Sequence, residues 1–127
     1  MPFRPLSNRR SLGQRAEALA ASYLEERGYR VVVRNWRRPE CELDMVVSQD
    51  DLCIFVEVRS RTGIESGHPL ETVTASKRAR ILRAARLYMD EEKPQAASFR
   101  FDVVGVTFGK DEQPTEIVHI EDAFQTG

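Results

Sequence analysis

Two short runs near the middle of the chain carry acidic side chains at positions that neighbouring β-strands would bring together. The runs are ELDMVVS over residues 42–48 and LCIFVEVR over residues 52–59. Successive side chains of a strand point to opposite faces, so residues two apart share a face. Both runs alternate in this way around a short polar turn, and together they predict a β-hairpin. Its purely apolar faces are predicted to hold Leu43, Met45 and Val47 on the first strand and Ile54, Val56 and Val58 on the second.

A two-residue turn at residues 50–51 fixes which residues of this hairpin face each other. It places Asp44 opposite Glu57, and Glu42 opposite Arg59. Directly opposed Cβ atoms lie roughly 4.5–5.5 Å apart, and like charges at that distance destabilise a sheet. A divalent cation between the two carboxylates is the simplest reason to keep them together.

These paired acids match the ligands that Mg²⁺ prefers, because the ion takes one or two protein carboxylates and completes its shell with water and phosphate. Bound Mg²⁺ or Mn²⁺ could polarise a phosphoryl oxygen and activate a water, and Arg59 on the face of Glu57 could stabilise the developing charge. The pattern suits phosphodiester hydrolysis. The alternative is a solvated strand face with an ordinary Glu42–Arg59 ion pair, although Phe55 on that face suggests partial cover.

Two amphipathic stretches predict the helices that would position the hairpin. Ser11 is a predicted N-cap for a helix from Leu12 to Arg27, and Gly28 is its predicted stop. Thr74 is expected to cap a second helix that runs to about Met89. We expect the second helix to bury Ala79, Leu82, Ala85 and Met89, with Ile81 and Tyr88 beside them.

The remaining apolar runs complete a sheet. Strands are predicted over 29–35, 99–107 and 115–120, with a break at 37–39 and a loop over 60–71. The element order α-β-β-β-α-β-β predicts an α/β fold in which a mixed β-sheet is flanked by helices.

The chain length favours one domain, over residues 11–127, preceded by a flexible basic N-terminal arm over residues 1–10. No apolar run is long enough to cross a bilayer and no secretory signal is evident, so we expect no membrane association and a cytoplasmic location. Cys41 and Cys53 lack metal-ligand spacing and are expected to be free thiols.

Charge is unevenly distributed although the formal net charge is only −1. Residues 1–38 hold nine Arg and three Glu, whereas residues 39–70 hold two Arg and seven acids. Residues 71–100 are basic again and residues 101–127 are acidic. A basic surface around an acidic site would suit a polyanion and a metal. Solvated surfaces of mixed sign account for the pattern equally well.

The second predicted helix carries Lys77, Arg80 and Arg83 near one face, at i, i+3 spacing. These residues, with Arg61 beyond the hairpin, could hold a nucleic-acid backbone, and a solvated basic face is the alternative. Glu17 lies at the edge of the apolar stripe of the first helix. It could reach the hairpin as a further metal or water ligand, and a surface ion pair is the alternative.

As an ordered set, the motifs resemble the YraN family of uncharacterised bacterial proteins, which is similar to Holliday-junction resolvases and other PD-(D/E)xK nucleases. The resemblance spans residues 11–106. It implies a restriction-endonuclease-like fold and a metal-dependent endonuclease or resolvase-like hydrolase of branched or structured DNA. It rests on SLGQRAEALAASYLEERGYRVVVRNWR, CELDMVV, LCIFVEVRSR, PLETVTASKRARILRAARLYM and FRFDVVGV.

The resemblance implies a role for each matching residue. Asp44 and Glu57 take the positions of the metal-binding acids, and Glu17 matches the helix glutamate of resolvase-like members, as a third ligand and catalytic residue. Arg59 takes the catalytic position of the motif lysine. Glu42 precedes the metal aspartate in a segment that resembles GEID and has a supporting role.

Two positions depart from the family pattern. Arg59 stands where the family usually has lysine. An arginine guanidinium holds its proton too tightly to deprotonate water, although it can stabilise charge. Cys41 stands where the family usually has glycine. Its Cβ removes conformational freedom at positive φ just before the strand that carries Asp44.

Two other classes of function remain open at this stage. One is a non-catalytic nucleic-acid-binding module, in which the basic arm and the second helix hold DNA. The other is a protein-interaction adaptor in DNA repair, in which the hairpin or an edge strand recruits a partner. A homodimer would suit a symmetric junction, but no sequence feature shows one.

Overall fold

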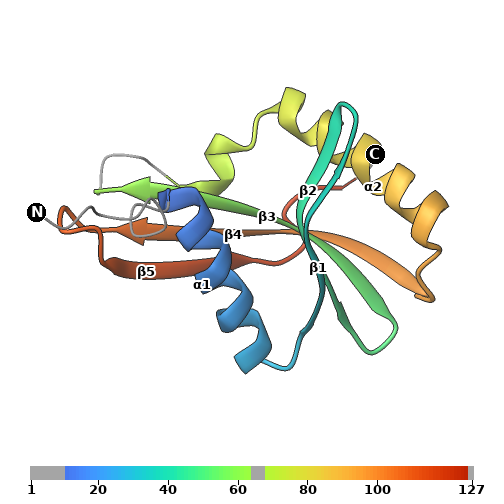
Figure 1. The fold of residues 1–127 in the computed structure, drawn as a ribbon, viewed down its shortest axis with the longest axis horizontal. Coiled ribbons are helices and arrows are strands. Elements are labelled where there is room, and N and C mark those ends of the chain that lie inside the picture. Colours follow the sequence, from blue (N-terminus) through green and yellow to red (C-terminus); the bar gives the residue numbers. More distant parts are fainter. Residues whose placement is uncertain (1–10, 64–67, 126–127) are drawn as a thin grey trace, which may run out of the picture.

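In a computed structural model, residues 11–63 and 68–125 form a five-stranded sheet with a long helix on each face (Figure 1). The predicted mixed α/β fold and the predicted order α-β-β-β-α-β-β are confirmed. The predicted N-terminal arm lies outside the described residues. The elements are α1 (Leu12–Glu26), β1 (Arg30–Arg38), β2 (Cys41–Gln49), β3 (Leu52–Thr62), the 3₁₀ helix η2 (Pro69–Thr72), α2 (Ala75–Glu92), β4 (Ser98–Phe108) and β5 (Pro114–Ile120).

The strands follow the chain order β1-β2-β3-β4-β5 across the sheet. All neighbours are antiparallel except β3 and β4, which run parallel. Parallel neighbours need a long crossover connection, and α2 with η2 supplies it. The central strand β3 therefore has an antiparallel neighbour, β2, on one side and a parallel neighbour, β4, on the other.

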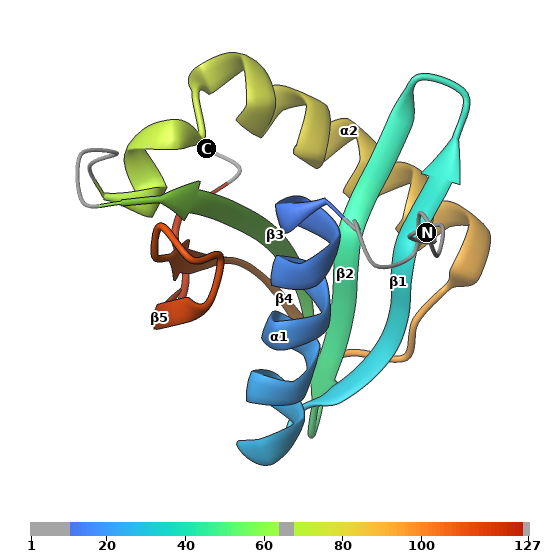
Figure 2. The same ribbon diagram turned by 60° about the vertical axis from the view of Figure 1, so that its left-hand side comes forward.

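Each helix packs on its own face of the sheet (Figure 2). The α1 side buries Ile54 and Val56, with Val58 partly buried beside them, which confirms the apolar face predicted for the second hairpin strand. The α2 side buries Phe55, as its place on the polar face suggested. Leu43 packs on the α2 side and Met45 on the α1 side, so the prediction that both share a face is wrong.

Both ends of α1 are fixed by local hydrogen bonds, as predicted. Ser11 and Gln14 form a capping box, which satisfies the first backbone N–H groups of the helix. At the other end Gly28 has a φ of 91°, and the Tyr29 N–H donates to the Leu24 carbonyl at 3.1 Å. This is the Schellman arrangement, which stops the helix and turns the chain into β1.

The N-cap predicted for α2 is confirmed, because the Thr74 side chain accepts a hydrogen bond from the Lys77 N–H. The predicted buried stripe is partly right: Ala85 is buried as expected, but Ala79 is exposed and Ala84 is buried in its place. The buried face is rotated toward Ile81 and Tyr88, which were expected beside the stripe. Ile81, Ala84, Ala85 and Tyr88 form the buried face.

The first strand is longer than predicted. β1 passes through the expected break and ends at Arg38, and the chain turns at Pro39 and Glu40, where Glu40 has a φ of 62°. The tip of the β1–β2 hairpin lies next to α2 (Figure 2). Arg38 Nε donates to Glu91 Oε1 at 2.8 Å, and this contact ties the tip to the helix.

The start of β1 also deviates from regular pairing, with a register shift between Val31 and Val33. This bulge lies on a strand that forms one edge of the sheet. Trp36 follows it and is buried against Tyr88, so it belongs to the core. The strand β3 continues to Thr62, so the loop that was predicted over residues 60–71 begins later than expected.

A buried carboxylate secures the end of the chain. Asp102 accepts two hydrogen bonds from Arg100, both at 2.8 Å, and one from the Asp122 N–H at 3.0 Å. His119 Nε2 lies 2.8 Å from the same carboxylate. Burial alone would raise the pKa of Asp102, but these partners outweigh it and lower the pKa. The ion pair between Asp102 and Arg100 is therefore structural.

No helix within the described residues is long and apolar enough to cross a membrane.

Pro69 packs directly on Gly105, which belongs to β4. A Cβ atom at position 105 would lie only 2.6 Å from the Pro69 Cβ atom, closer than real contacts allow. Pro69 is buried at the start of η2. The glycine is therefore needed for close approach between η2 and the sheet.

We expect Gly105→Ala to destabilise the protein by about 1–3 kcal/mol, because overpacking displaces η2. Chemical denaturation measures the effect. Gly13→Ala is the matched control: its new Cβ would find nothing closer than 3.9 Å, so a gain of about 0.5–1 kcal/mol is expected. Equal unfolding free energies for the two variants would contradict the steric argument.

Candidate active site

The candidate site begins where β2 separates from β3. The hairpin register is as predicted for five pairs and its last pair is Met45 with Val56. The same register would place Leu43 opposite Val58. Instead, the Val58 N–H donates to Asp44 Oδ2 at 2.9 Å. The aspartate side chain thus accepts the bond that a strand carbonyl would otherwise accept, and the two strands diverge.

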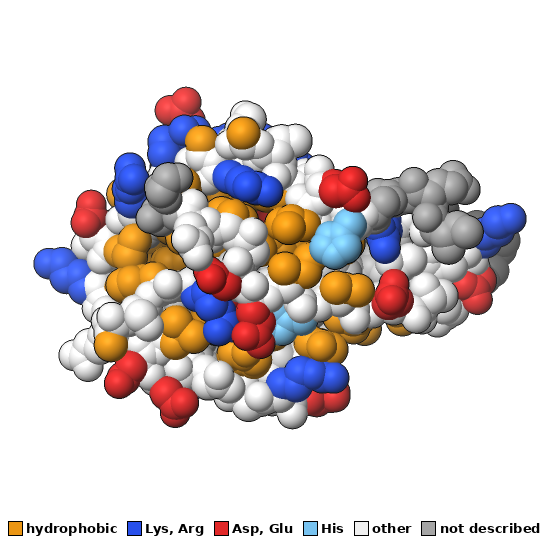
Figure 3. Space-filling model, turned by 180° about the vertical axis from the view of Figure 1, so that it is seen from behind, with side chains coloured by type: hydrophobic (Ala, Val, Ile, Leu, Met, Phe, Trp, Pro, Cys, Tyr) orange, Lys and Arg blue, Asp and Glu red, His pale blue; other side chains and the backbone are white. Residues whose placement is uncertain are grey.

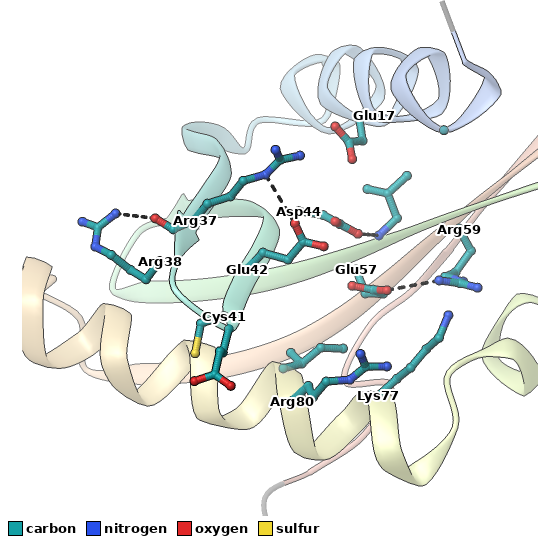
Figure 4. A pocket seen from close by; sticks show the side chains of 14 residues that line it. Glu17, Arg37, Arg38, Cys41, Glu42, Asp44, Glu57, Arg59, Lys77 and Arg80 are labelled. Atoms are coloured by element: carbon teal, nitrogen blue, oxygen red, sulfur yellow. Dashed lines mark hydrogen bonds and ion pairs between the residues drawn. The ribbon is translucent and has the colours of Figure 1, made fainter.

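The divergence opens a cleft of about 620 Å³ between the strands (Figure 4). Because it lies in a gap in the sheet, residues from both helices line it, although the helices cover opposite faces. The charged side chains in its lining are Glu17 from α1, Arg37, Arg38, Glu40, Glu42 and Asp44 from the β1–β2 hairpin, Glu57 and Arg59 from β3, and Lys77 and Arg80 from α2.

Asp44 is the most perturbed acid of the cleft. Burial is the main cause, and it raises the pKa of Asp44 together with the neighbouring Glu57 carboxylate. The hydrogen bond from the Val58 N–H opposes the rise, and the result is a pKa of about 7. Asp44 and Glu57 are neighbours as expected, although the ladder of paired residues ends at Met45. Their repulsion favours a proton or a cation between them.

The predicted pairing of Glu42 with Arg59 is wrong. Glu42 pairs across the strands with Arg37, at 3.3 Å between Arg37 Nε and Glu42 Oε2. Arg59 instead lies 3.4 Å from Glu57 Oε2 through its Nη1 atom. Two physical reasons explain this: β2 has already left β3 at Glu42, and β1 extends far enough to reach it.

Glu17 does face the cleft from α1 (Figure 4). Burial raises its pKa first, and Asp44 adds to the rise, whereas the Asn35 side chain and nearby arginines oppose it. Asn35 has a φ of 54° and lies across from Asp44 between two ladder pairs. The sequence analysis did not single out Asn35. Its residue type was the available signal, because asparagine tolerates this left-handed conformation.

The four residues predicted to hold nucleic acid divide into two pairs. Lys77 and Arg80 line the cleft. Arg83 is exposed and is not among the lining residues, because each three-residue step rotates by about 60° around the helix. Arg61 donates from Nε to Thr107 Oγ1 on β4 at 3.0 Å and also lies outside the lining. Arg37, whose position in the cleft the sequence did not indicate, lines it instead.

Cys41 lines the cleft next to the hairpin turn. The residue with positive φ in this turn is Glu40, whereas Cys41 is not among the residues with positive φ. The conformational constraint of a positive φ, which was expected at Cys41, therefore applies to Glu40 instead.

The donor set fits a hard cation held by two protein ligands. Among the described residues, no three His, Cys, Asp or Glu side chains converge as a preformed metal group. Asp44 and Glu57 still supply two adjacent carboxylates, which is what Mg²⁺ typically takes from a protein, with water and phosphate completing the shell. The residues present fit Mg²⁺ or Mn²⁺ in this restricted sense.

A second hollow lies between α2 and the start of β4, with a volume of about 470 Å³. Figure 3 shows hydrophobic side chains gathered on the face seen from behind. The lining includes Phe99, Phe101 and Phe124, and Asp122 is its one acidic residue among the described residues. It lacks the paired acids that define the cleft.

Fold and cleft together define a small mixed α/β domain with paired acids in a gap between two strands. The chain belongs to the uncharacterised protein family UPF0102, the YraN family, whose family model matches residues 16–106. The family resemblance seen in the sequence is thus confirmed.

The chain is similar to UPF0102 proteins over most of its length. It is 43% identical to that of Syntrophotalea carbinolica, over 91% of this chain and 93% of that protein. It is 41% identical to that of Rhodococcus opacus, over 90% of this chain and 96% of that protein. It is 34% identical to that of Chloroherpeton thalassium, over 91% of this chain and 95% of that protein.

The raised pKa of Asp44 predicts a pH dependence of stability in metal-free buffer. The folded protein holds a proton that the unfolded chain releases near pH 4, so this stabilisation is present below about pH 4 and is lost as the pH rises through about 7. The slope approaches about 1.4 kcal/mol for each pH unit.

Asp44→Asn removes this titration and keeps an oxygen for the Val58 N–H. Urea denaturation across this pH range, with a chelator present, should show that the variant gains stability relative to wild type as the pH rises. A difference that does not change with pH would contradict the perturbed carboxyl.

Proposed function

We propose that the protein is a Mg²⁺- or Mn²⁺-dependent endonuclease that hydrolyses phosphodiester bonds in branched or structured DNA. The observation that carries the proposal is the half-buried Asp44 carboxylate beside Glu57, in a cleft with basic walls. Strongly perturbed carboxyls in a cleft are candidates for functional sites. The preference for branched DNA follows from the family's similarity to resolvases.

Asp44 and Glu57 would hold the metal, which when bound supplies a polarised phosphoryl oxygen and a more acidic water. Asp44 is well suited to this task, because the Val58 N–H fixes one of its oxygens at 2.9 Å and leaves the carboxylate oriented. Glu57 comes from a strand that is paired along its whole length with β4. Both acids therefore stand on strands, which hold ligands more precisely than loops do.

Arg59 would stabilise negative charge on the attacked phosphate, because its guanidinium stays protonated and faces the cleft. It cannot remove a proton from water, so another group has to accept it. Glu17 faces the same cleft, and burial raises its pKa toward neutral pH. We assign it the role of orienting the water and accepting its proton.

The walls of the cleft would hold the substrate. Lys77 and Arg80 present positive charge from α2, and Arg37 does so from the hairpin tip. Contacts of this kind position a nucleic-acid backbone without reading its sequence. The arrangement supports a substrate chosen for its shape.

The test is cleavage of junction, flap, nicked and single-stranded DNA by purified protein with Mn²⁺. Asp44→Ala should reduce cleavage by more than about 100-fold. Mutation of a residue that only supports a metal ligand typically costs up to about 100-fold, and Asp44 is proposed to be a ligand itself. Calorimetric titration of Mn²⁺ should show binding to wild type that the variant loses. Glu116→Ala is the matched control, because it removes one exposed carboxylate on β5 and should change neither readout.

Absence of cleavage of every substrate by wild type, or equal cleavage by Asp44→Ala, would overturn the nuclease proposal.

A non-catalytic nucleic-acid-binding module is the second candidate. The observation that favours it is the Arg59–Glu57 contact at 3.4 Å, which partly satisfies Glu57 without a metal. Under this proposal DNA binding needs no metal and survives Asp44→Ala. If wild type binds no nucleic acid at moderate salt, the adaptor reading takes its place.

Both nucleic-acid proposals predict that the cleft cations contact phosphates. Lys77→Ala and Arg80→Ala should each weaken binding and reduce the slope of log affinity against log salt by about 0.9. Arg83→Ala removes an exposed cation of the same helix outside the cleft lining and is the matched control. Fluorescence anisotropy at several salt concentrations measures the slopes, and equal slopes for all three variants would place the DNA elsewhere.

A further inference from the structure

The Arg59 guanidinium donates a hydrogen bond to a side chain that does not line the cleft. Its Nε donates to Thr72 Oγ1 at 2.8 Å. Thr72 ends η2, the short 3₁₀ helix between β3 and α2. The sequence alone indicated no role for Thr72.

The hydroxyl of Thr72 makes a directional bridge. Its one hydrogen is donated to the Pro69 carbonyl at 2.7 Å, so its lone pairs are left to accept from Arg59. The guanidinium thereby uses Nε for Thr72, while Nη1 lies 3.4 Å from Glu57 Oε2. The planar fork is oriented on two sides, with further Nη N–H groups available to a phosphate.

The bridge stands on a well-anchored support. Arg59 and Gly105 are register partners on β3 and β4, and Pro69 packs on Gly105. His68 and Glu71 cap η2, which contains Pro at its start. After Thr72 the chain buries Val73 in the core. The position of the Thr72 hydroxyl is thus fixed independently of the acids in the cleft.

This independence matters if Glu57 holds a cation. A metal on the Glu57 carboxylate would weaken its attraction for Arg59, and the long arginine side chain would then have many rotamers available. The bond to Thr72 involves no metal ligand, so it would persist. It keeps the guanidinium in place when the ion pair with Glu57 cannot.

We propose that Thr72 is a positioning residue, which holds the Arg59 guanidinium toward the phosphate site through a hydrogen bond to Nε. The catalytic consequence rests on the proposed nuclease function. Sub-ångström placement of a charged group is worth large factors in rate, and misplacement by about 1 Å can cost about 100-fold.

The experiment compares Thr72→Val, which keeps the shape and loses the hydroxyl, with Thr72→Ser, which keeps both bonds. With Mn²⁺ and the DNA that wild type cuts best, we expect Thr72→Val to lower kcat by about 10- to 100-fold with little change in KM. Thr72→Ser should restore most of the rate. Thr115→Val is the matched control, because its hydroxyl also donates to a backbone carbonyl, at 3.2 Å, but holds no arginine.

A double-mutant cycle separates positioning from a structural role. In an Arg59→Gln background, Thr72→Val should cause no further loss of kcat, since the group that it positions is gone. The same fold loss in both backgrounds would overturn the proposal. A comparable loss in Thr115→Val would overturn it too. Thermal unfolding verifies that each variant is folded, and Thr72→Ala provides a second hydroxyl deletion if the valine variant is not.

NMR of the Arg59 Nε–H group tests the contact without activity. Its resonance should exchange slowly with water in wild type and Thr72→Ser, and quickly in Thr72→Val. Equal exchange in all three proteins would overturn the proposed contact. If wild type cuts no DNA, the nuclease proposal fails with its catalytic consequence, while the exchange rates still decide whether Thr72 holds Arg59.

Discussion

One hydrogen bond, from the Val58 N–H to the Asp44 carboxylate, marks the point where β2 separates from β3. It satisfies a donor of β3 at the point where β2 leaves, so the sheet can split without an unpaired amide. The split admits residues of both helices into one cleft. It also places the half-buried Asp44 carboxylate beside Glu57. The cleft and its acidity have a common origin.

Two carboxylates on the sheet show how the surroundings of an acid decide its use. Asp102 has an arginine, a histidine and a backbone N–H as partners, and its pKa is lowered. Asp44 has a single backbone N–H and another carboxylate, and its pKa is raised. The first acid is satisfied and secures the chain. The Asp44 carboxylate keeps oxygen lone pairs that a cation or a proton can occupy.

Local chemistry in the sequence predicted much of this structure. The caps Ser11 and Thr74 define helix starts, and a two-residue turn sets the register that brings Asp44 to Glu57, because these rules act between near neighbours. The partners of Glu42 and Arg59 could not be predicted, since they depend on where β2 leaves β3. The buried face of α2 was predicted only in part, because apolar residues lie around much of this helix and their spacing alone does not show which of them meet the sheet.

The bulge in β1 has a consequence for how copies of the protein could meet. An edge strand with regular unpaired amides invites another strand to extend the sheet, and irregular, charged edges discourage it. β1 combines a shifted register at Val31–Val33 with arginines at its start and end. Sheet extension across this edge is therefore disfavoured, which protects concentrated protein from stacking into fibres and directs any pairing of copies to other surfaces.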